Sequence, residues 1–328
     1  MCKQVTYQFR GPLPDPREGP RTKPEGSPAV PRSASSPTPQ RETAPIEAIL
    51  LFDIDGVLRD VSGSYRRAIQ ATVRHYSGWT PEGAAIDALK GEGLWNNDWE
   101  ASLELLRRHR QDRGTPDGTD GATTPLPRLR EIVDVFSGFY FGGDPWGPPS
   151  GWQGFIREET LLVDASFFTA LSAAGMAWGF VSGAEGPSAR FLLEERLGLR
   201  QPPLVAMEDA PQKPDPAGLL ALAERLAARR DQALGPEAPP VVYLGDTVAD
   251  VETVLRARQQ RPDQRFLALA VAPPHLHGPE RLAQRRAYEE RLVTAGADHL
   301  LTRTSALSHA PRALIASLLE RQADAPGA

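Results

Sequence analysis

The sequence has one cysteine, little aromatic content and no long apolar run. Cys2 alone cannot form an intramolecular disulfide or a zinc site built from several cysteines. That scarcity is typical of a reducing compartment, so we expect a cytoplasmic protein. No stretch approaches the roughly 20 apolar residues that a membrane helix requires. The chain also lacks a basic excess, because its net charge is −5 and its pI is near 5.8. We therefore expect neither a membrane nor a nucleic-acid partner.

The first 45 residues contain little apolar sequence and many Pro, Ser, Arg and Gly residues. They lack the apolar centre of a secretory signal, and their acidic residues are unusual in an organelle transit peptide. A segment of this composition buries too little apolar surface to fold by itself. We therefore predict a disordered tail over residues 1–45. A transit peptide or a start codon assigned too early is the alternative.

The remainder alternates short apolar runs with helix-like segments. Residues 48–53, AILLFD, have the pattern of a strand that is buried on both faces of a parallel sheet. Later runs of the same kind end at Ser182, Glu208, Asp246, Val271 and Leu301. Helical spacing of apolar residues occurs between them, at residues 188–197, 217–230 and 248–258. This alternation predicts an α/β fold with a doubly wound parallel sheet.

About 125 residues separate the first run from the run that ends at Ser182, which is far more than one crossover helix needs. Apolar spacing predicts helices there at residues 65–76, 80–89, 98–110 and 126–141, and turn residues predict a flexible excursion at 114–125. We therefore predict a smaller helical cap domain, residues 64–160. It is inserted into a core domain made of residues 46–63 and 161–320.

Polar residues follow the predicted strands at the point where each strand ends. Ligands gather at the carboxyl ends of the strands in open parallel α/β sheets. We expect one site there, formed by Asp53, Asp55, Ser182, Gly183, Lys213, Asp246 and Asp250.

The carboxylates of this set repel one another, by roughly 4 kcal/mol for a pair 4 Å apart at an effective dielectric near 20. Lys213 supplies one positive charge, so a further cation is needed to offset the rest. The ligands are all oxygen atoms, which favours Mg²⁺. We predict that Asp246 and Asp250 hold this ion beside Asp53.

The same residue types suit phosphoryl transfer. The Asp53 carboxylate can attack phosphorus and form an acyl phosphate, which divides one difficult displacement into two easier ones. Asp55, across the turn at Gly56, can protonate the leaving alcohol and later deprotonate the attacking water. Ser182, neighbouring backbone N–H groups and Lys213 can hold the phosphoryl oxygens.

Four motifs in order, DIDGV, FVSG, KPDP and GDTVAD, resemble those of the haloacid dehalogenase superfamily of phosphatases. The resemblance covers about residues 48–302, and the long insert looks like the helical C1 cap of the phosphoglycolate phosphatase and β-phosphoglucomutase branch. One departure is Val57, where the family often has Thr. The resemblance implies Asp53 as nucleophile, Asp55 as acid/base, Ser182, Gly183 and Lys213 as phosphate binders, and a Mg²⁺ site of Asp53, the Asp55 carbonyl, Asp246 and Asp250.

Each residue also has a plain structural interpretation. Ser182 can cap a helix, Lys213 can be a solvated loop residue, and Asp250 can be a first-turn acid favoured by the helix dipole. The function most favoured is Mg²⁺-dependent hydrolysis of a small phosphorylated metabolite. A phosphomutase, or a binding or regulatory protein with decayed chemistry, is the alternative. The substrate and the oligomeric state are not readable from one sequence.

Within the insert, the segment KGEGLWNNDW combines two tryptophans with amide side chains. We predict that Lys90, Asn96, Asn97 and Trp99 contact the part of the substrate beyond its phosphate. The alternative is a loop anchored by buried tryptophan. Arg59 and Tyr65 are predicted to lie near the entrance of the site, whereas the two histidines of PPHLHGP indicate a polar loop rather than a metal site.

Overall fold

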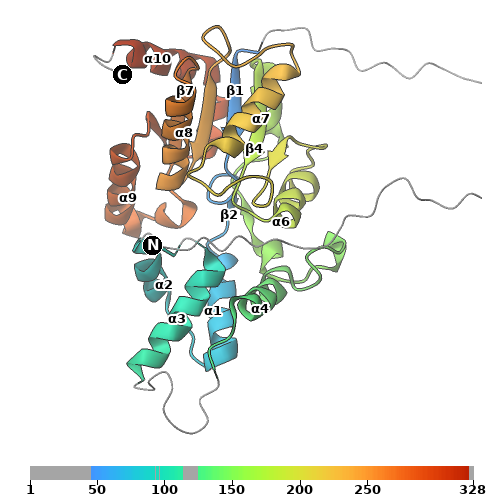
Figure 1. The fold of residues 1–328 in the computed structure, drawn as a ribbon, viewed down its shortest axis with the longest axis vertical. Helices are drawn as coiled ribbons and strands as arrows, with labels where there is room; N and C mark the ends of the chain where they lie inside the picture. Colours follow the sequence, from blue (N-terminus) through green and yellow to red (C-terminus); the bar gives the residue numbers. More distant parts are fainter. Residues whose placement is uncertain (1–45, 93, 96, 114–124, 325–328) are drawn as a thin grey trace, which may run out of the picture. The chain divides into compact units, whose positions relative to one another are not determined.

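The computed structural model describes residues 46–324 except 93, 96 and 114–124. Its centre is a six-stranded parallel sheet with the order β5-β4-β1-β6-β7-β8 (Figure 1). The predicted α/β fold with a doubly wound parallel sheet is therefore confirmed. The strands are β1 (Ala48–Phe52), β4 (Met176–Val181), β5 (Leu204–Val205), β6 (Val241–Gly245), β7 (Phe266–Val271) and β8 (His299–Leu301).

Strand β1 lies in the interior of the sheet, between β4 and β6. Successive side chains of a strand point to opposite faces, and here both faces are apolar. Ile49 and Leu51 belong to one buried cluster, whereas Leu50 and Phe52 belong to another. This double burial explains why β1 is a continuous apolar run.

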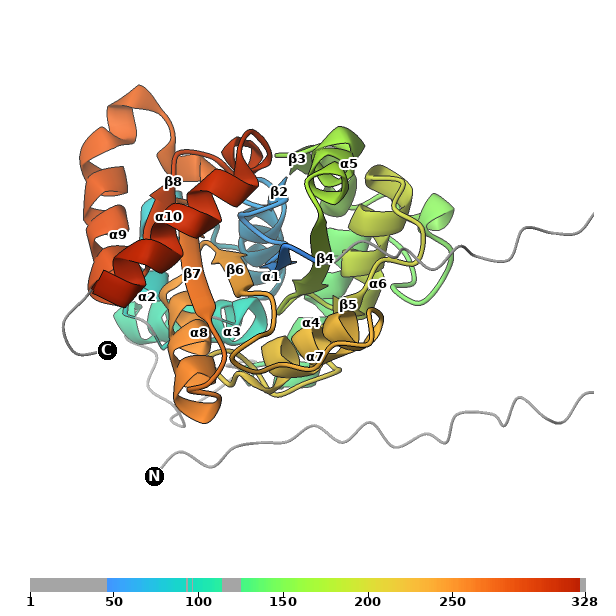
Figure 2. The same cartoon turned by 90° about the horizontal axis from the view of Figure 1, so that it is seen from above.

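Helices cover both faces of the sheet (Figure 2). On one face α7 (Ala217–Ala228), α8 (Val248–Gln260) and α9 (Leu282–Thr294) contribute to the apolar cluster that contains Leu51. On the other face α5 (Ala165–Ala173), the π-helical segment η3 (Phe191–Arg196) and α10 (Pro311–Asp324) pack against Phe52 and its neighbours. The short helices are α6 (Gly186–Arg190) and the 3₁₀ turns η1 (Pro149–Gly151), η2 (Phe155–Glu158), η4 (Pro274–Leu276), η5 (Pro279–Arg281) and η6 (Thr304–Ser308).

Four helices are inserted between β1 and β4 and share a separate apolar cluster, which also includes Phe191 of η3. They are α1 (Tyr65–Ser77), α2 (Gly83–Gly91), α3 (Asp98–Asp112) and α4 (Leu129–Phe141). The chain passes to these helices through β2 (Arg59–Asp60) and returns through β3 (Thr160–Leu161), and the two strands pair antiparallel. We call residues 64–160 the cap. The described residues fall into one compact unit, so the division into core and cap domains stays a prediction.

Two helices begin later than their apolar spacing predicts. Helix α2 begins at Gly83 rather than residue 80, and α4 begins at Leu129 rather than residue 126. Pro81 and Pro127 explain the shift, because a proline disfavours helical dihedrals in the residue before it.

Strand β5 is shorter than its apolar run, since it ends at Val205 rather than near Glu208. The side chain of Asp209 turns back and accepts a hydrogen bond from the backbone N–H of Ala206 at 2.9 Å. That contact gives Ala206 a local partner in place of a strand partner. The predicted helix at residues 188–197 is likewise divided into α6 and η3.

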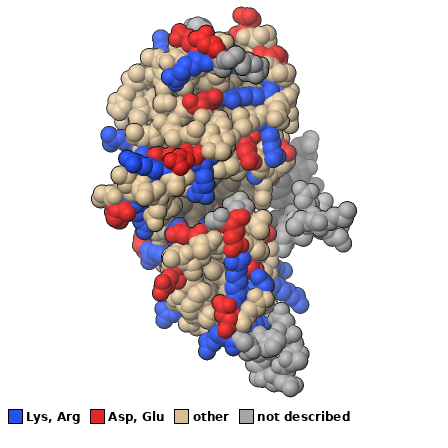
Figure 3. Space-filling view, turned by 90° about the vertical axis from the view of Figure 1, so that its left-hand side faces the viewer, with Lys and Arg blue, Asp and Glu red and all other residues tan. Residues whose placement is uncertain are grey.

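The tail at 1–45 and most of the excursion at 114–125 lie outside the described residues. In the part of the chain that is described, no helix combines the length and the apolar content needed to cross a bilayer. Figure 3 shows Lys and Arg side chains interspersed with Asp and Glu on the face that it displays, without a continuous basic region.

Candidate functional site

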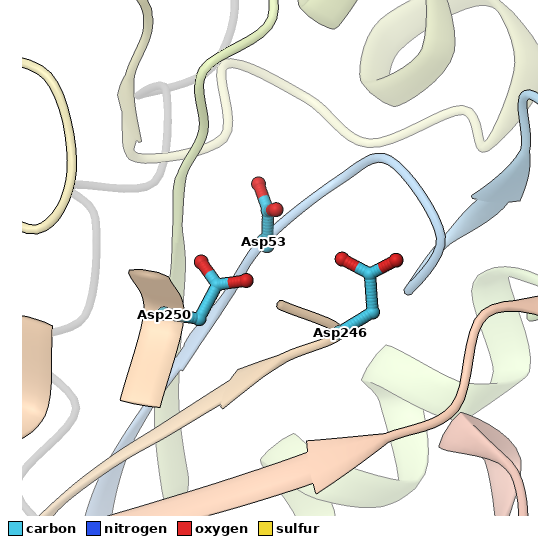
Figure 4. A group of neighbouring side chains, drawn as sticks. All are labelled: Asp53, Asp246 and Asp250. Carbon is cyan, nitrogen blue, oxygen red and sulfur yellow. The ribbon is translucent and has the colours of Figure 1, made fainter. Parts of the chain in front are cut away.

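Three carboxylates from separate segments meet at the carboxyl edge of the sheet (Figure 4). Asp53 directly follows β1, Asp246 directly follows the neighbouring strand β6, and Asp250 lies in the first turn of α8. One oxygen atom from each lies within 4.8 Å of the others. All three side chains are buried. The structure thus brings together three of the acids that the sequence predicts to share a site.

Lys213 reaches this group from the loop before α7. Its Nζ lies 2.9 Å from Oδ2 of Asp53 and 2.6 Å from Oδ1 of Asp250. Burial opposes the charge of this ammonium, but Asp250 and Asp53 raise the pKa of Lys213 well above its usual value. One lysine therefore neutralises part of the charge of three buried carboxylates.

Tyr243, in the middle of β6, supports this lysine and was missed by the sequence reasoning. Its hydroxyl accepts a hydrogen bond from Lys213 Nζ at 3.1 Å and donates to the backbone carbonyl of Val181 at 2.8 Å. The sequence held one clue to this role, which is the position of Tyr243 within an otherwise apolar strand. A buried tyrosine hydroxyl usually has a hydrogen-bond partner.

Asp250 has both carboxylate oxygens engaged. Oδ1 accepts from Lys213, and Oδ2 accepts from the backbone N–H of Thr247 at 2.9 Å and from its hydroxyl at 2.6 Å. Burial opposes ionisation, but the Lys213 ammonium and the Thr247 contacts lower the pKa of Asp250 below its usual value. A cation bound directly to Asp250 would share its carboxylate oxygens with these donors. Its predicted role as a metal ligand stays a prediction.

In the described part of the chain, Asp250 accepts hydrogen bonds at both carboxylate oxygens, whereas Asp53 and Asp246 do not. Oδ1 of Asp53 is buried, and no residue that the structure describes donates a hydrogen bond to it. Burial raises the pKa of Asp53 to about 6, and the carboxylates of Asp250 and Asp55 add to the effect while Lys213 opposes it. Burial, followed by repulsion from Asp250 and Asp53, also raises the pKa of Asp246 well above its usual value. Buried oxygen atoms that lack a positive partner fit a hard divalent cation such as Mg²⁺.

Two glycines allow the acids to approach. Gly56 has φ +74°, and a Cβ atom there would lie 2.0 Å from Oδ2 of Asp246. A Cβ atom at Gly245 would lie 2.2 Å from Cβ of Asp250. A side chain at either position would push an acid out of the group.

Ser182 follows β4, the strand beside β1, so it lies at the same edge of the sheet as Asp53. Its Oγ accepts a hydrogen bond from the backbone N–H of Ala184 at 3.2 Å, which leaves its own hydroxyl hydrogen to donate. Gly183 is exposed, and the space where a Cβ atom would lie is open to at least 4 Å. Both properties suit the predicted phosphate-binding role, which stays a prediction.

Asp55 lies in the turn after β1, and its side chain is 27% exposed. Its Oδ1 accepts a hydrogen bond from Nε of Arg59 at 2.7 Å. Arg59 was expected near the entrance of the site, but its side chain is fully buried. Tyr65 stacks on Tyr140 of the cap, with ring centroids 4.5 Å apart.

The cap segment has structural contacts of its own. Lys90 forms an ion pair with Asp98 at 2.6 Å. Oδ1 of Asn97 accepts from the backbone N–H groups of Trp99 and Glu100, so this side chain caps α3. Trp99 packs on the apolar cluster of the cap, and Asn96 lies outside the described residues. Substrate contact by these residues stays a prediction.

Solved structures with the same arrangement identify the fold. A phosphonoacetaldehyde hydrolase-like protein from Oleispira antarctica superposes with a TM-score of 0.57 and 17% identity, over 87% of this chain and 97% of that one. A chain from Bacteroides fragilis described as haloacid dehalogenase-like gives a TM-score of 0.50 at 18% identity, over 79% and 99%. This chain has the haloacid dehalogenase fold. The superfamily resemblance is confirmed at the level of the fold, and the C1 type of its cap stays a prediction.

Sequence comparison gives relatives that match part of this haloacid dehalogenase-fold chain. It is 34% identical over 212 residues to an imidazoleglycerol-phosphate dehydratase from Phytophthora nicotianae, and the match covers 63% of this chain and 41% of the relative. It is 29% identical over 213 residues to a phosphoglycolate phosphatase from Rhodospirillum rubrum, covering 63% and 75%. The chain thus matches less than half the length of the first relative. No family model matches it.

Proposed function

We propose that this chain is a phosphatase that hydrolyses a small phosphomonoester through an aspartyl phosphate formed on Asp53. The observation that carries the proposal is the environment of Asp53. One of its oxygens is held by Lys213 at 2.9 Å, while the other is buried beside Asp246 with no hydrogen-bond donor among the described residues. Lys213 therefore fixes the orientation of this carboxylate, which a nucleophile that attacks phosphorus requires.

The first half of the reaction forms a bond from an Asp53 oxygen to phosphorus and breaks the bond from phosphorus to the ester oxygen. Asp55 donates a proton to that oxygen, so the product leaves as a neutral alcohol. In the second half, Asp55 removes a proton from water, and the water oxygen attacks the same phosphorus atom. Inorganic phosphate leaves, and the Asp53 carboxylate is regenerated.

Lys213 and Ser182 act on the phosphoryl group in both halves. The ammonium and the free hydroxyl hydrogen are donors that can bind the phosphoryl oxygens, where charge is spread in the transition state. Tyr243 and Asp250 hold the ammonium in place through the contacts described above.

Mg²⁺ is the cofactor that the donor set favours. Asp53, Asp246, Asp250 and the backbone carbonyl of Asp55 would hold it. When bound, it would offset the repulsion between the nucleophile and the negatively charged phosphate.

A small phosphorylated metabolite is the substrate class that the relatives support. The matched protein from Rhodospirillum rubrum is named as a phosphatase of phosphoglycolate, and the name of the other relative also contains a phosphate ester. Phosphoglycolate is therefore the first ester to test, followed by phosphates with larger organic parts.

The deciding experiment measures release of inorganic phosphate from 4-nitrophenyl phosphate and phosphoglycolate, with Mg²⁺ and with excess chelator. We expect activity that needs Mg²⁺ and falls by at least about a thousandfold in Asp53→Asn, since the neutral amide is a poor nucleophile. Asp263→Asn is the matched control, because Asp263 is exposed in the loop between α8 and β7, away from the carboxyl edge. Wild-type turnover in Asp53→Asn would reject the proposal.

A further inference from the structure

Arg59 is an arginine with no solvent exposure, and each part of its guanidinium has a different partner. Nε donates to Oδ1 of Asp55 at 2.7 Å, NH1 donates to Oε2 of Glu159 at 2.9 Å, and NH2 donates to Oγ of Ser188 at 2.8 Å. The planar guanidinium holds its donors in a fixed fork, so three simultaneous contacts fix its orientation. A buried charge is costly unless it is paired in this way.

The position of Arg59 in the chain is as informative as its contacts. Arg59 belongs to β2, on the segment that leaves the core for the cap. Glu159 is the residue before β3, on the segment that returns. Its side chain is 2% exposed. The ion pair thus joins the two chain crossings across 100 residues of sequence.

Glu159 extends the contact into the cap. Its Oε1 accepts hydrogen bonds from Ser64 Oγ at 2.6 Å and from the hydroxyl of Tyr140 at 3.0 Å. Ser64 precedes α1, and Tyr140 lies in α4. Oγ of Ser188, on α6 of the core, lies 2.9 Å from the Tyr140 hydroxyl. A continuous buried set of polar side chains therefore connects Asp55 with two cap helices.

We propose that Arg59 is a positioning residue that holds the Asp55 carboxylate in place, and that Glu159 and Tyr140 make this hold depend on the placement of the cap. The role of Asp55 as acid/base rests on the proposed function. In the described part of the chain, Arg59 is the side chain bonded to Asp55. It occupies Oδ1 and leaves Oδ2 to face the leaving group. A fixed direction matters because a general acid must lie within hydrogen-bond reach of the oxygen that it protonates.

The test compares two esters in the full-length protein. An alkyl phosphate has a poor leaving group that needs protonation, whereas 4-nitrophenolate leaves readily without it. Arg59→Lys keeps the positive charge for Glu159 but cannot reproduce the three-way fork. We expect it to lower kcat/KM, which reports the first half of the reaction alone, by about tenfold or more for the alkyl ester and by no more than about twofold for the aryl ester.

Arg258→Lys is the matched control. Arg258 lies in α8 and uses two nitrogens to bind the carbonyl of Phe266 and the carboxylate of Asp298, away from the site. The loss of this fork should affect stability without discriminating between the two esters. Tyr140→Phe removes one hydroxyl from the cap side, and we expect a smaller loss that also falls selectively on the alkyl ester.

Asp55→Asn supplies the second readout. If Arg59 acts through Asp55, then adding Arg59→Lys to Asp55→Asn should cost little more, because the group being positioned no longer donates a proton. Additive losses in the double variant would overturn the proposal. Equal losses of kcat/KM for both esters in Arg59→Lys would also overturn it, because they would indicate a purely structural role.

A crystal structure of Arg59→Lys tests whether Arg59 fixes the orientation of the Asp55 carboxylate. This test does not depend on any measurement of activity. The proposal expects the Asp55 carboxylate to change orientation or to adopt more than one, while Arg258→Lys leaves it unchanged. An Asp55 side chain that stays in place without its partner would contradict it. If the wild-type chain releases phosphate from no ester, the proposed function fails, but the position of Asp55 still decides whether Arg59 holds it.

Discussion

The ammonium of Lys213 lies closer to Asp250, at 2.6 Å, than to Asp53, at 2.9 Å. Asp250 is fixed in turn by the first turn of α8, where its Oδ2 accepts from Thr247. The position of the helix therefore sets the position of the lysine, and the lysine sets the orientation of Asp53. This chain of contacts gives Asp250 a structural role in the site in addition to its predicted part in metal binding.

Lys213→Met should destabilise the protein by about 3 to 5 kcal/mol, because it leaves the buried Asp53 and Asp250 without their cation. The measurement is urea unfolding in chelator. Arg256→Met, which removes an exposed partner of Glu252, should cost less than about 1 kcal/mol. Similar unfolding midpoints for the two variants would show that Lys213 does not compensate the buried carboxylates.

Mg²⁺ should stabilise the wild-type fold, because the ion binds the folded site and not the unfolded chain. At a concentration of 100 times Kd the gain is about 2.7 kcal/mol. Asp246→Asn should remove most of this gain, since it deletes the negative charge of one of the three acids grouped as possible ligands. Thermal unfolding with and without Mg²⁺ measures the effect. An unchanged response to Mg²⁺ in Asp246→Asn would place the ion elsewhere.

The sequence was sufficient for the sheet and for the acids at its edge. Strands such as β1 and β6 are buried on both faces, which produces continuous apolar runs that end at Asp53 and Asp246. Adjacent parallel strands then bring these ends together without further information. The apolar runs along the chain, together with the rule that ligands gather at the carboxyl ends of parallel strands, were therefore enough to predict the acids at the edge of the sheet.

The polar contacts behind the acids depend on residues that are far apart in sequence. Lys213 and Tyr243 are 30 residues apart, and Arg59 and Glu159 are 100 apart. No local periodicity indicates which buried donor will meet which acceptor. The partners of Arg59 could therefore not be predicted, and neither could the depth at which its side chain is buried.

Asn97→Ala should destabilise the cap by about 1 kcal/mol, because it removes the side-chain cap of α3. Asn97→Ser keeps a capping oxygen and should cost only a few tenths of a kcal/mol. If Asn97 also contacts substrate, both variants should change the preference among phosphate esters, by about tenfold or more in kcat/KM. A changed preference in Asn97→Ala alone would assign Asn97 to cap folding and withdraw its role in recognition.

Glu185 lies directly before α6, and Glu208 is near enough to repel its carboxylate. Burial, followed by repulsion from Glu208, raises the pKa of Glu185 from 4.5 to about 7, although Arg59 opposes the shift. In the unfolded chain the same group ionises near 4.5. Between these two values the folded state therefore holds a proton that the unfolded state has lost. Ionisation of Glu185 consequently opposes folding at higher pH.

Below about pH 4.5 the carboxyl is protonated in both states, so Glu185→Gln should leave the free energy of unfolding unchanged. As pH rises through about 7, the wild type loses stability that the neutral amide keeps. The variant should then be more stable than the wild type by about 1 to 3 kcal/mol, after allowance for partial solvent exposure.

Urea unfolding from pH 5 to 8.5 measures the difference, with the exposed Glu195→Gln as the matched control. A constant difference across this range would show that Glu185 does not carry the raised pKa. If the variant is less stable than the wild type at pH 8, the ionised Glu185 carboxylate has a favourable partner. Arg59 would be that partner, because its charge opposes the rise in the pKa of Glu185.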